Sequence, residues 1–360
     1  MNQTNVIESQ PLAPLKVENP TEKEQNKKYL TSHHGKPTDA MASMTFKHIK
    51  DNTDIISNTA EMTSKGVTGV ITGIGQIKGT YGISTHKLLS KAMHLFTSAN
   101  DSDNSENISR EVVFPLKEYA IQCGYDVIKH PTNTPAEEEK EAKRVKSQMD
   151  KFRRQTKKDL MLLLSFSLTW QEKKKNDTGD FLGVNLLEMA ALQRGQIHIK
   201  FSGSMAQYLI KTPLTQYPKA LLRITGHSNN AYSMGLAMAE HYNIRSNHKK
   251  GNAQKLKVKT LLKSTDLPSV EEVRKGRKSW RERLQSPFEK SLEKLGDTQV
   301  LADWEYYIDG EPLITKESDE THTADFKSFE DWLNAVVFFT LKDAPDHTQW
   351  QDEEPPQINS

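Results

Sequence analysis

Hydrophobic positions follow a helical period in some parts of the chain and a strand period of two in others, which predicts alternating helices and strands. Before residue 66 neither period is evident, and scattered Pro, Asn, Gln, Lys and Glu predict a polar, disordered arm over 1–65. Extended structure is expected in the glycine-rich stretch 66–82. A helix then begins at Ser84 or Thr85 and extends to about Ser98.

The following part of the chain predicts helices and then a β-hairpin. A short strand near 112–114 and a short helix near 116–123 come first. Thr134-Pro-Ala-Glu137 has the composition of a capping box and begins a long helix that ends near Leu160. Three strands are expected after it, over 162–171, 183–190 and 196–201. Helices followed by a β-hairpin are typical of a winged helix-turn-helix.

The same order of elements is predicted a second time. Helices are expected over 217–224 and 231–242, and a short strand or turn over 256–258. A longer helix is expected over 279–295, which Pro287 should bend or restart. One face of this helix is apolar and contains Trp280, Leu284, Phe288, Leu292 and Leu295.

Strands over 300–308 and 335–341 complete the second hairpin, with an acidic insertion between them. Two copies of one order predict an α+β protein with two tandem winged-helix domains. The expected boundaries are a polar arm over 1–65, a first domain over 66–212, a second over 213–345 and an acidic tail over 346–360.

Charge is strongly segregated along the chain, although the net charge is only +2. The segment 245–294 contains 15 basic and six acidic residues, a net charge of +9. From residue 296 to the end, three basic residues face 16 acidic ones, a net charge of −13. A basic middle segment is typical of proteins that bind a polyanion such as DNA.

Cysteine usage and hydropathy set the expected compartment. The single cysteine, Cys123, excludes an internal disulfide and a cysteine-based zinc finger. No apolar run approaches the roughly 20 residues that a membrane-spanning helix needs, and no secretory signal is visible. These features predict a cytoplasmic protein without a membrane partner.

The N-terminal end of the helix at 279–295 is the first candidate DNA contact. Arginine suits bidentate contacts to guanine, whereas lysine acts as a point charge on phosphate. The alternative interpretation is a solvated charged face, balanced by Glu282, Glu289 and Glu293. The candidate residues of the second domain are Lys255, Lys257, Lys259, Lys263, Arg274, Lys275, Arg277, Lys278, Arg281 and Arg283.

The long helix of the first domain is the second candidate. Eight cations line it between Lys143 and Lys158, and some of them could pair with Glu137–Glu141 one turn away instead of contacting DNA. Affinity that rests on such phosphate contacts falls steeply with salt. The predicted DNA contacts are Lys143, Lys146, Arg153, Arg154 and Lys157, and the other three cations of this stretch are Arg144, Lys151 and Lys158.

No enzymatic site, metal site or cofactor site is predicted. The glycines of 73–79 have neither the dinucleotide-binding spacing nor the Gly-Lys-Ser/Thr ending of a P-loop, and a bend is the better interpretation. Metal-dependent replication nucleases need two histidines that flank one apolar residue, whereas His33 and His34 are adjacent and His198 stands alone. His227 and His241 are interpreted as ordinary core or surface residues.

Several short sequences are distinctive in both expected domains. The first domain contains Gly195-Gln-Ile-His-Ile-Lys-Phe-Ser202, Tyr208-Leu209 and Tyr217-Pro-Lys-Ala-Leu-Leu222. The second contains Lys278-Ser-Trp-Arg281, Arg283-Leu284, Pro287-Phe288, Leu292 and Trp304. These sequences resemble the replication initiators of iteron plasmids. The resemblance extends over about 66–343 in the order of elements and is loose in residues.

The resemblance implies a plasmid-type replication initiator that binds double-stranded DNA at repeated sites of an origin. It implies that the second domain contacts bases in the major groove, and that the first contacts DNA and forms a homodimer, with the monomer active at the origin. It also implies recruitment of host initiator and helicase proteins. The long N-terminal arm, the turn at 173–179 and the acidic insertion at 310–331 depart from the family pattern. The alternatives are a winged-helix transcriptional regulator or autorepressor, and a nicking nuclease.

Overall fold

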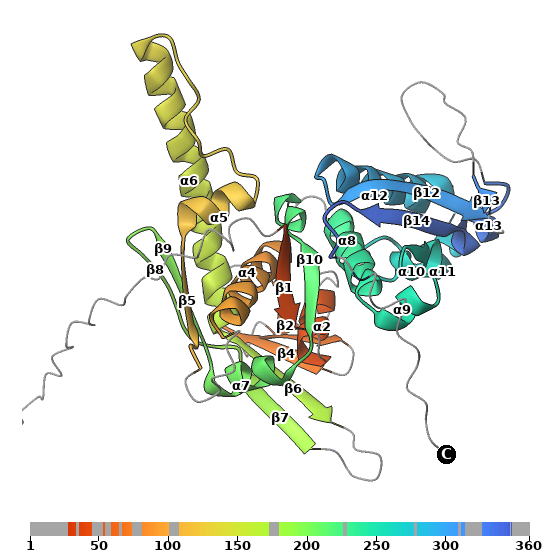
Figure 1. The fold of residues 1–360 in the computed structure, drawn as a ribbon, viewed down its shortest axis with the longest axis horizontal. Helices are drawn as coiled ribbons and strands as arrows, with labels where there is room; N and C mark the ends of the chain where they lie inside the picture. Colours follow the sequence, from red (N-terminus) through yellow and green to blue (C-terminus); the bar gives the residue numbers. More distant parts are fainter. Residues whose placement is uncertain are drawn as a thin grey trace, which may run out of the picture.

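The computed structural model describes residues 28–33, 36–44, 53–54, 59–64, 67–73, 81–100, 108–172, 180–225, 229–276, 279–308, 311–313, 326–345 and 347. In this part of the chain the protein is mixed α+β, with small antiparallel sheets (Figure 1).

A first unit consists of three helices and a three-stranded sheet. Helix α4 (Ile83–Ala99) is followed by strand β5 (Glu111–Pro115), helix α5 (Leu116–Gln122) and the long helix α6 (Pro135–Leu164). Strands β8 (Leu187–Gln193) and β9 (Gln196–Phe201) form a hairpin. Both β5 and β8 pair antiparallel with β9, so the sheet order is β5-β9-β8.

A second unit repeats this order of elements. Helix α8 (Asn229–Tyr242) is followed by the short helix α9 (Arg245–Lys249), strand β11 (Lys255–Lys257), and helices α10 (Val258–Leu262) and α11 (Val270–Lys275). A long helix then comprises a π-turn (Arg281–Gln285) and α12 (Ser286–Asp297). The remaining elements are β12 (Leu301–Ile308), β13 (Glu311–Pro312), α13 (Phe329–Asn334) and β14 (Val336–Leu341).

The sheet of the second unit has the order β11-β14-β12-β13. In both units, therefore, the last strand (β9 or β14) pairs on one side with the strand near the first helix (β5 or β11) and on the other with the first arm of the hairpin (β8 or β12). Apart from the two-residue β13, which pairs with β12 at the edge of the second sheet, the order helix, strand, helices, hairpin and the strand order first-third-second are common to the two units.

Further elements extend the first unit. Strands β2 (Thr53–Asp54), β3 (Thr59–Ser64), β4 (Val67–Thr72), β6 (Phe166–Glu172) and β7 (Asp180–Asn185) form a five-stranded antiparallel sheet, which helix α2 (Lys36–Met44) contacts. Strand β1 (Tyr29–His33) pairs with β10 (Leu214–Pro218), between helix α7 (Gly203–Lys211) and the 3₁₀ helix η1 (Lys219–Arg223).

The disordered arm expected over 1–65 is wrong for its described part. Strand β1, helix α2 and strand β3 lie there, and Leu30, Met41 and Met44 are buried in the first hydrophobic cluster. Polar residues dominate the segment, so its average composition hides these apolar ones. Strand β1 pairs with β10, a partner far away in sequence.

Two of the expected strands have different bounds. Helix α6 continues to Leu164, because Leu162 and Leu163 are buried as helical residues, and β6 starts only at Phe166. The strand expected over 183–190 is two strands, β7 and β8, which belong to different sheets and are separated by the buried Leu186.

The helix expected over 217–224 is also wrong. Tyr217 and Pro218 end strand β10, and only the short η1 follows. Pro218 pairs with Tyr29 at the end of the two-stranded sheet, a position that tolerates a residue without a backbone N–H.

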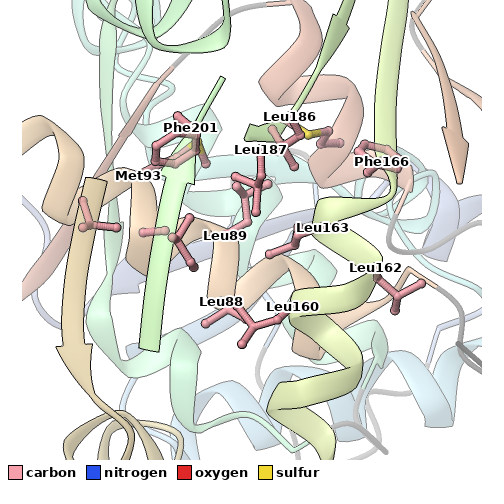
Figure 2. Close-up of a cluster of buried hydrophobic side chains, with 14 of the residues drawn as sticks. Leu88, Leu89, Met93, Leu160, Leu162, Leu163, Phe166, Leu186, Leu187 and Phe201 are labelled. Carbon is pink, nitrogen blue, oxygen red and sulfur yellow. The ribbon is translucent and has the colours of Figure 1, made fainter. Parts of the chain in front are cut away.

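Hydrophobic side chains form two clusters, one around each unit. In the first, Leu160 and Leu163 of α6 lie close to Leu88 and Leu89 of α4, whereas Leu162 points to another side of the helix (Figure 2). In the second, Leu284, Phe288, Leu292 and Leu295 are fully buried, as the predicted apolar face of the 279–295 helix requires, and Trp280 packs at the edge.

Polar groups join the two units where α4 meets α8 and η1. The ring Nδ1 of His86 lies 2.8 Å from the Tyr232 hydroxyl, and the Lys87 ammonium donates to the Ile224 carbonyl. Burial lowers the pKa of His86 to about 4 and that of Lys87 to about 8. The Lys87 ammonium also lies 5.6 Å from the centre of the Tyr232 ring.

Candidate nucleic-acid interface

Helix α6 exposes an uninterrupted group of cations on two of its turns. Residues 151–158 contain five basic residues and no acidic one, and all five basic side chains are exposed. The inner face of the same turns buries Phe152, Thr156 and Asp159. We call Lys151, Arg153, Arg154, Lys157 and Lys158 the α6 cation cluster. Three of the five were predicted contacts, and the run of cations without an acid is the signal that would have added Lys151 and Lys158.

The N-terminal half of α6 has a different charge pattern. It projects beyond the body of the unit (Figure 1), and residues 135–150 carry four bases and five acids. Lys143 pairs with Glu139 at 2.6 Å, as the alternative interpretation of this helix expected. Lys146 is exposed on the same half. The projecting half is therefore nearly neutral, whereas the cation cluster is not.

Arg144 holds a loop against the projecting half. Its guanidinium contacts the Asp126 and Glu141 carboxylates at 2.5 and 2.7 Å, and donates to the Ile128 carbonyl at 2.9 Å. The bonds from Arg144 and from the His130 backbone N–H lower the pKa of Glu141 to about 2. This arginine has a structural role, and we leave it out of the candidate interface.

The helix itself begins as the sequence predicts. The Thr134 hydroxyl accepts from the Glu137 backbone N–H at 3.3 Å, and the Glu137 carboxylate accepts from the Thr134 N–H at 3.2 Å. This capping box fixes the first turn of a helix about 45 Å long, at 1.5 Å per residue. The cluster thus lies on a rigid element.

The cations of the second unit come from several elements. Lys255 and Lys257 flank the buried Leu256 on β11, an edge strand of its sheet, where lysine also prevents strand pairing with another chain. The other described candidates lie on α10, α11 and the π-turn. Lys255, Lys257, Lys259, Lys263, Arg274, Lys275 and Arg281 are exposed, and Arg283 is half-buried. Arg277 and Lys278 lie outside the described residues.

Pro287 gives the long helix of this unit its local geometry. Proline lacks the N–H that an α-helix needs at this position, and its ring clashes with the carbonyl one turn earlier. The Ser286 N–H donates instead to the Arg281 carbonyl, five residues back, and the π-turn over Arg281–Gln285 results. The predicted bend is therefore a change of helical register, located next to the candidate cations.

Glu289 is not one of the surface charges that the sequence interpretation assumed. Its side chain is only 3% exposed. It accepts hydrogen bonds from the Gln285 amide at 2.8 Å and the Tyr306 hydroxyl at 3.3 Å. A carboxylate at this position bonds the helix to strand β12 and does not offset the charge of the exposed cations.

Three candidate cations of the second unit bond to the segment before β14. Arg274 pairs with the Glu330 carboxylate, and the Arg281 guanidinium donates to the Phe326 carbonyl at 2.6 Å. The Lys259 ammonium donates to the Asn334 amide oxygen at 3.3 Å. This region overlaps the acidic insertion expected over 310–331, and helix α13 within it was not predicted, although Ser328 caps it.

The described residues also include histidines, carboxylates and the single cysteine. No group of three or more His, Cys, Asp or Glu in this part of the chain could hold a metal ion. Cys123 is buried, which raises the pKa of its thiol to about 11. None of the described helices has the length and apolar character that crossing a membrane requires.

No known protein family model matches this chain, and neither does any curated protein.

Proposed function

We propose that this protein binds double-stranded DNA through two winged-helix units and acts as a plasmid-type replication initiator. The observation that carries the proposal is the repeated topology together with the cations. In each unit the strand order, apart from β13, is first-third-second. The long helix of the first unit, and the region around the start of the long helix of the second, expose basic side chains. This order of elements and strands supports the proposal of a winged helix, a fold in which the helix before the hairpin enters the major groove.

The dimensions and charges of these helices support contact with a duplex. An α-helix with its side chains is about 10–12 Å wide, which matches a major groove about 12 Å wide. Five exposed basic residues on two turns of α6 can contact DNA phosphates, and such contacts do not read the sequence of the DNA bases. In the second unit, arginines near the start of the long helix can bind guanine edges.

Binding to repeated sites at an origin comes from the resemblance to iteron-plasmid initiators, and the charge distribution agrees with it. The proposed DNA ligand is a duplex with direct repeats. On this proposal, the protein acts without catalysis of its own, in the cytoplasm, and recruits host replication proteins afterwards.

Footprinting on the DNA that flanks the gene tests the proposal. We expect protection of direct repeats by the full chain, lost as salt rises. Tight binding elsewhere without protection of repeats would contradict origin recognition. Incubation of supercoiled DNA with the protein and magnesium or manganese should leave the DNA intact. A nick would indicate a nuclease instead.

A second assay separates the initiator from the transcriptional regulator. The gene and its flanking DNA are placed on a vector that cannot replicate alone. Autonomous maintenance supports the initiator, whereas repeat protection without maintenance favours a regulator or autorepressor that uses the same DNA-binding face.

A further inference from the structure

One short segment, residues 326–334, contacts three cations that the proposed DNA-binding face would use. The cations come from three different elements: Lys259 from α10, Arg274 from α11 and Arg281 from the π-turn. Glu330 supplies a full negative charge to Arg274, while Phe326 and Asn334 supply neutral oxygens to Arg281 and Lys259. The segment thereby supplies acceptors of the kind that a DNA backbone would offer.

The segment is fixed in place by the core beneath it. Phe326 is 1% exposed and Trp332 is fully buried, and the indole N–H of Trp332 donates to the Tyr306 hydroxyl at 3.2 Å. Phe329 stacks on Trp280 with ring centres 5.2 Å apart. Because removal of the segment would expose these aromatic side chains, the backbone of Glu330 stays near Arg274 whether or not DNA is bound, and only the exposed carboxylate can move.

The ion pair itself is accessible to a competing anion. About half of each side chain is exposed, 52% for Arg274 and 59% for Glu330. Pairs this exposed contribute little to stability, since water and salt screen them. A phosphate oxygen can therefore replace the Glu330 carboxylate on Arg274 without unfolding any element.

We propose that Glu330 is an internal competitor of DNA phosphate for Arg274, so that the second unit binds DNA more weakly than its cations alone would allow. The inference rests on the proposed function. A duplex that approaches this face must displace one carboxylate, and the displaced charge then repels the nearby phosphates.

Binding of a labelled duplex with the flanking repeats to full-length variants tests the competition. Glu330→Gln keeps the side-chain shape and removes the charge, and the matched control is Glu311→Gln on β13, an exposed residue of the same sheet. At fixed salt we expect Glu330→Gln to bind about three- to fivefold more tightly than wild type, and Glu311→Gln to change affinity less. Equal melting temperatures of the three proteins show that the fold is unchanged.

Arg274→Gln, introduced into both backgrounds, identifies the cation. We expect it to lower affinity more in the Glu330→Gln chain, where no carboxylate competes, than in wild type. An equal gain from Glu330→Gln and Glu311→Gln, or an equal cost of Arg274→Gln in both backgrounds, would overturn the inference. Absence of duplex binding by the wild-type chain would instead refute the proposed function.

Discussion

At the scale of single residues, Gly69 of β4 allows an aromatic ring to approach the backbone. A Cβ atom at this position would lie 2.6 Å from Cζ of Phe166 and 3.2 Å from Sδ of Met44. Phe166 is 1% exposed and stacks on Tyr81, so its ring has no space to move. Gly69→Ala should therefore lower the free energy of unfolding by about 1–3 kcal/mol.

Chemical denaturation followed by circular dichroism measures this loss, and Gly296→Ala is the control. No atom lies within 4 Å of a Cβ at Gly296, which is in helix α12. There the change should leave stability unaltered or raise it by up to about 1 kcal/mol. Equal behaviour of the two variants would show that the contact at Gly69 carries no constraint.

Buried histidines predict a loss of stability in acid. Burial lowers the pKa values of His33 and His86 from 6.5 to about 4. Each histidine thus stabilises the fold above pH 6.5, and this contribution, about 3 kcal/mol each, is lost as the pH falls towards 4. Asp159 acts in the opposite sense. Burial raises its pKa from 3.8 to about 6, so its contribution is present below pH 3.8 and is lost as the pH rises through 6.

Two histidines outweigh one aspartate, and the free energy of unfolding should fall between pH 6.5 and 4.5. His86→Gln should reduce this decrease, because one of the two proton acceptors is gone. Urea denaturation at several pH values measures the slopes, and an identical slope for His86→Gln and wild type would contradict the argument.

At the scale of elements, the α6 cation cluster and the projecting half of α6 should differ in their effect on DNA binding. Arg153→Gln with Lys157→Gln removes two exposed charges of the cluster, which lie one helical turn from each other. The slope of log K against log salt is negative, and each lost phosphate contact should reduce its magnitude by about 0.9. We therefore expect the magnitude to fall by about two, and the affinity to fall tenfold or more at low salt. Fluorescence anisotropy over a salt series measures both quantities.

Lys140→Gln with Lys143→Gln is the matched control on the same helix. It removes the same total charge, but from a half in which Lys143 already pairs with Glu139. We expect a salt slope close to that of wild type. A control that lost as much as the cluster variant would show that net charge, and not the cluster, determines binding.

Elements whose limits are local could be predicted from the sequence, and the others could not. The start of α6 was predictable because Thr134 and Glu137 satisfy each other's backbone N–H groups. Its end was not, since Leu162 and Leu163 suit a helix and a strand equally and their burial in the first hydrophobic cluster decides. The break at Leu186 depends on two different sheets, which no local pattern encodes.

The candidate interface divides in the same way. The run of basic residues without acidic ones over 151–158 is visible in the sequence, and α6 exposes all five basic side chains. The pairing of Arg274 with Glu330 joins residues 56 positions apart, and the charge totals of the two segments do not specify it. The burial of Glu289 could not be predicted either, because its partner Tyr306 lies on a different element, strand β12.

At the scale of the whole molecule, the repeated order of elements was predictable, whereas the elements added to it were not. Strands β6 and β7 interrupt the first unit between α6 and its hairpin, and join β4 in a separate sheet. Strand β1 joins β10, about 185 residues further along the chain. These pairings depend on closure of long loops, so their stability comes from tertiary contacts and leaves no period in the sequence.

The contact between α4 and α8 predicts that the two units unfold together. Tyr232 is 2% exposed, and Ile83 at the start of α4 belongs to the second hydrophobic cluster. Trp170 lies in the first cluster and Trp332 in the second, so tryptophan fluorescence with and without Trp170→Phe distinguishes the units during denaturation. In the wild-type chain both signals should change at one denaturant concentration, because neither unit can lose the contact without exposing buried groups of the other.

Tyr232→Ala removes the ring that covers His86 and Lys87, at a cost of roughly 3–5 kcal/mol. The second unit should then unfold at lower denaturant, before the Trp170 signal changes. Tyr232→Phe keeps the ring and loses only the hydroxyl beside His86, so it should keep a single transition with a smaller loss of about 1–3 kcal/mol. Two separate transitions in the wild-type chain would mean that this polar contact does not couple the units, and that each must be stabilised by its own core alone.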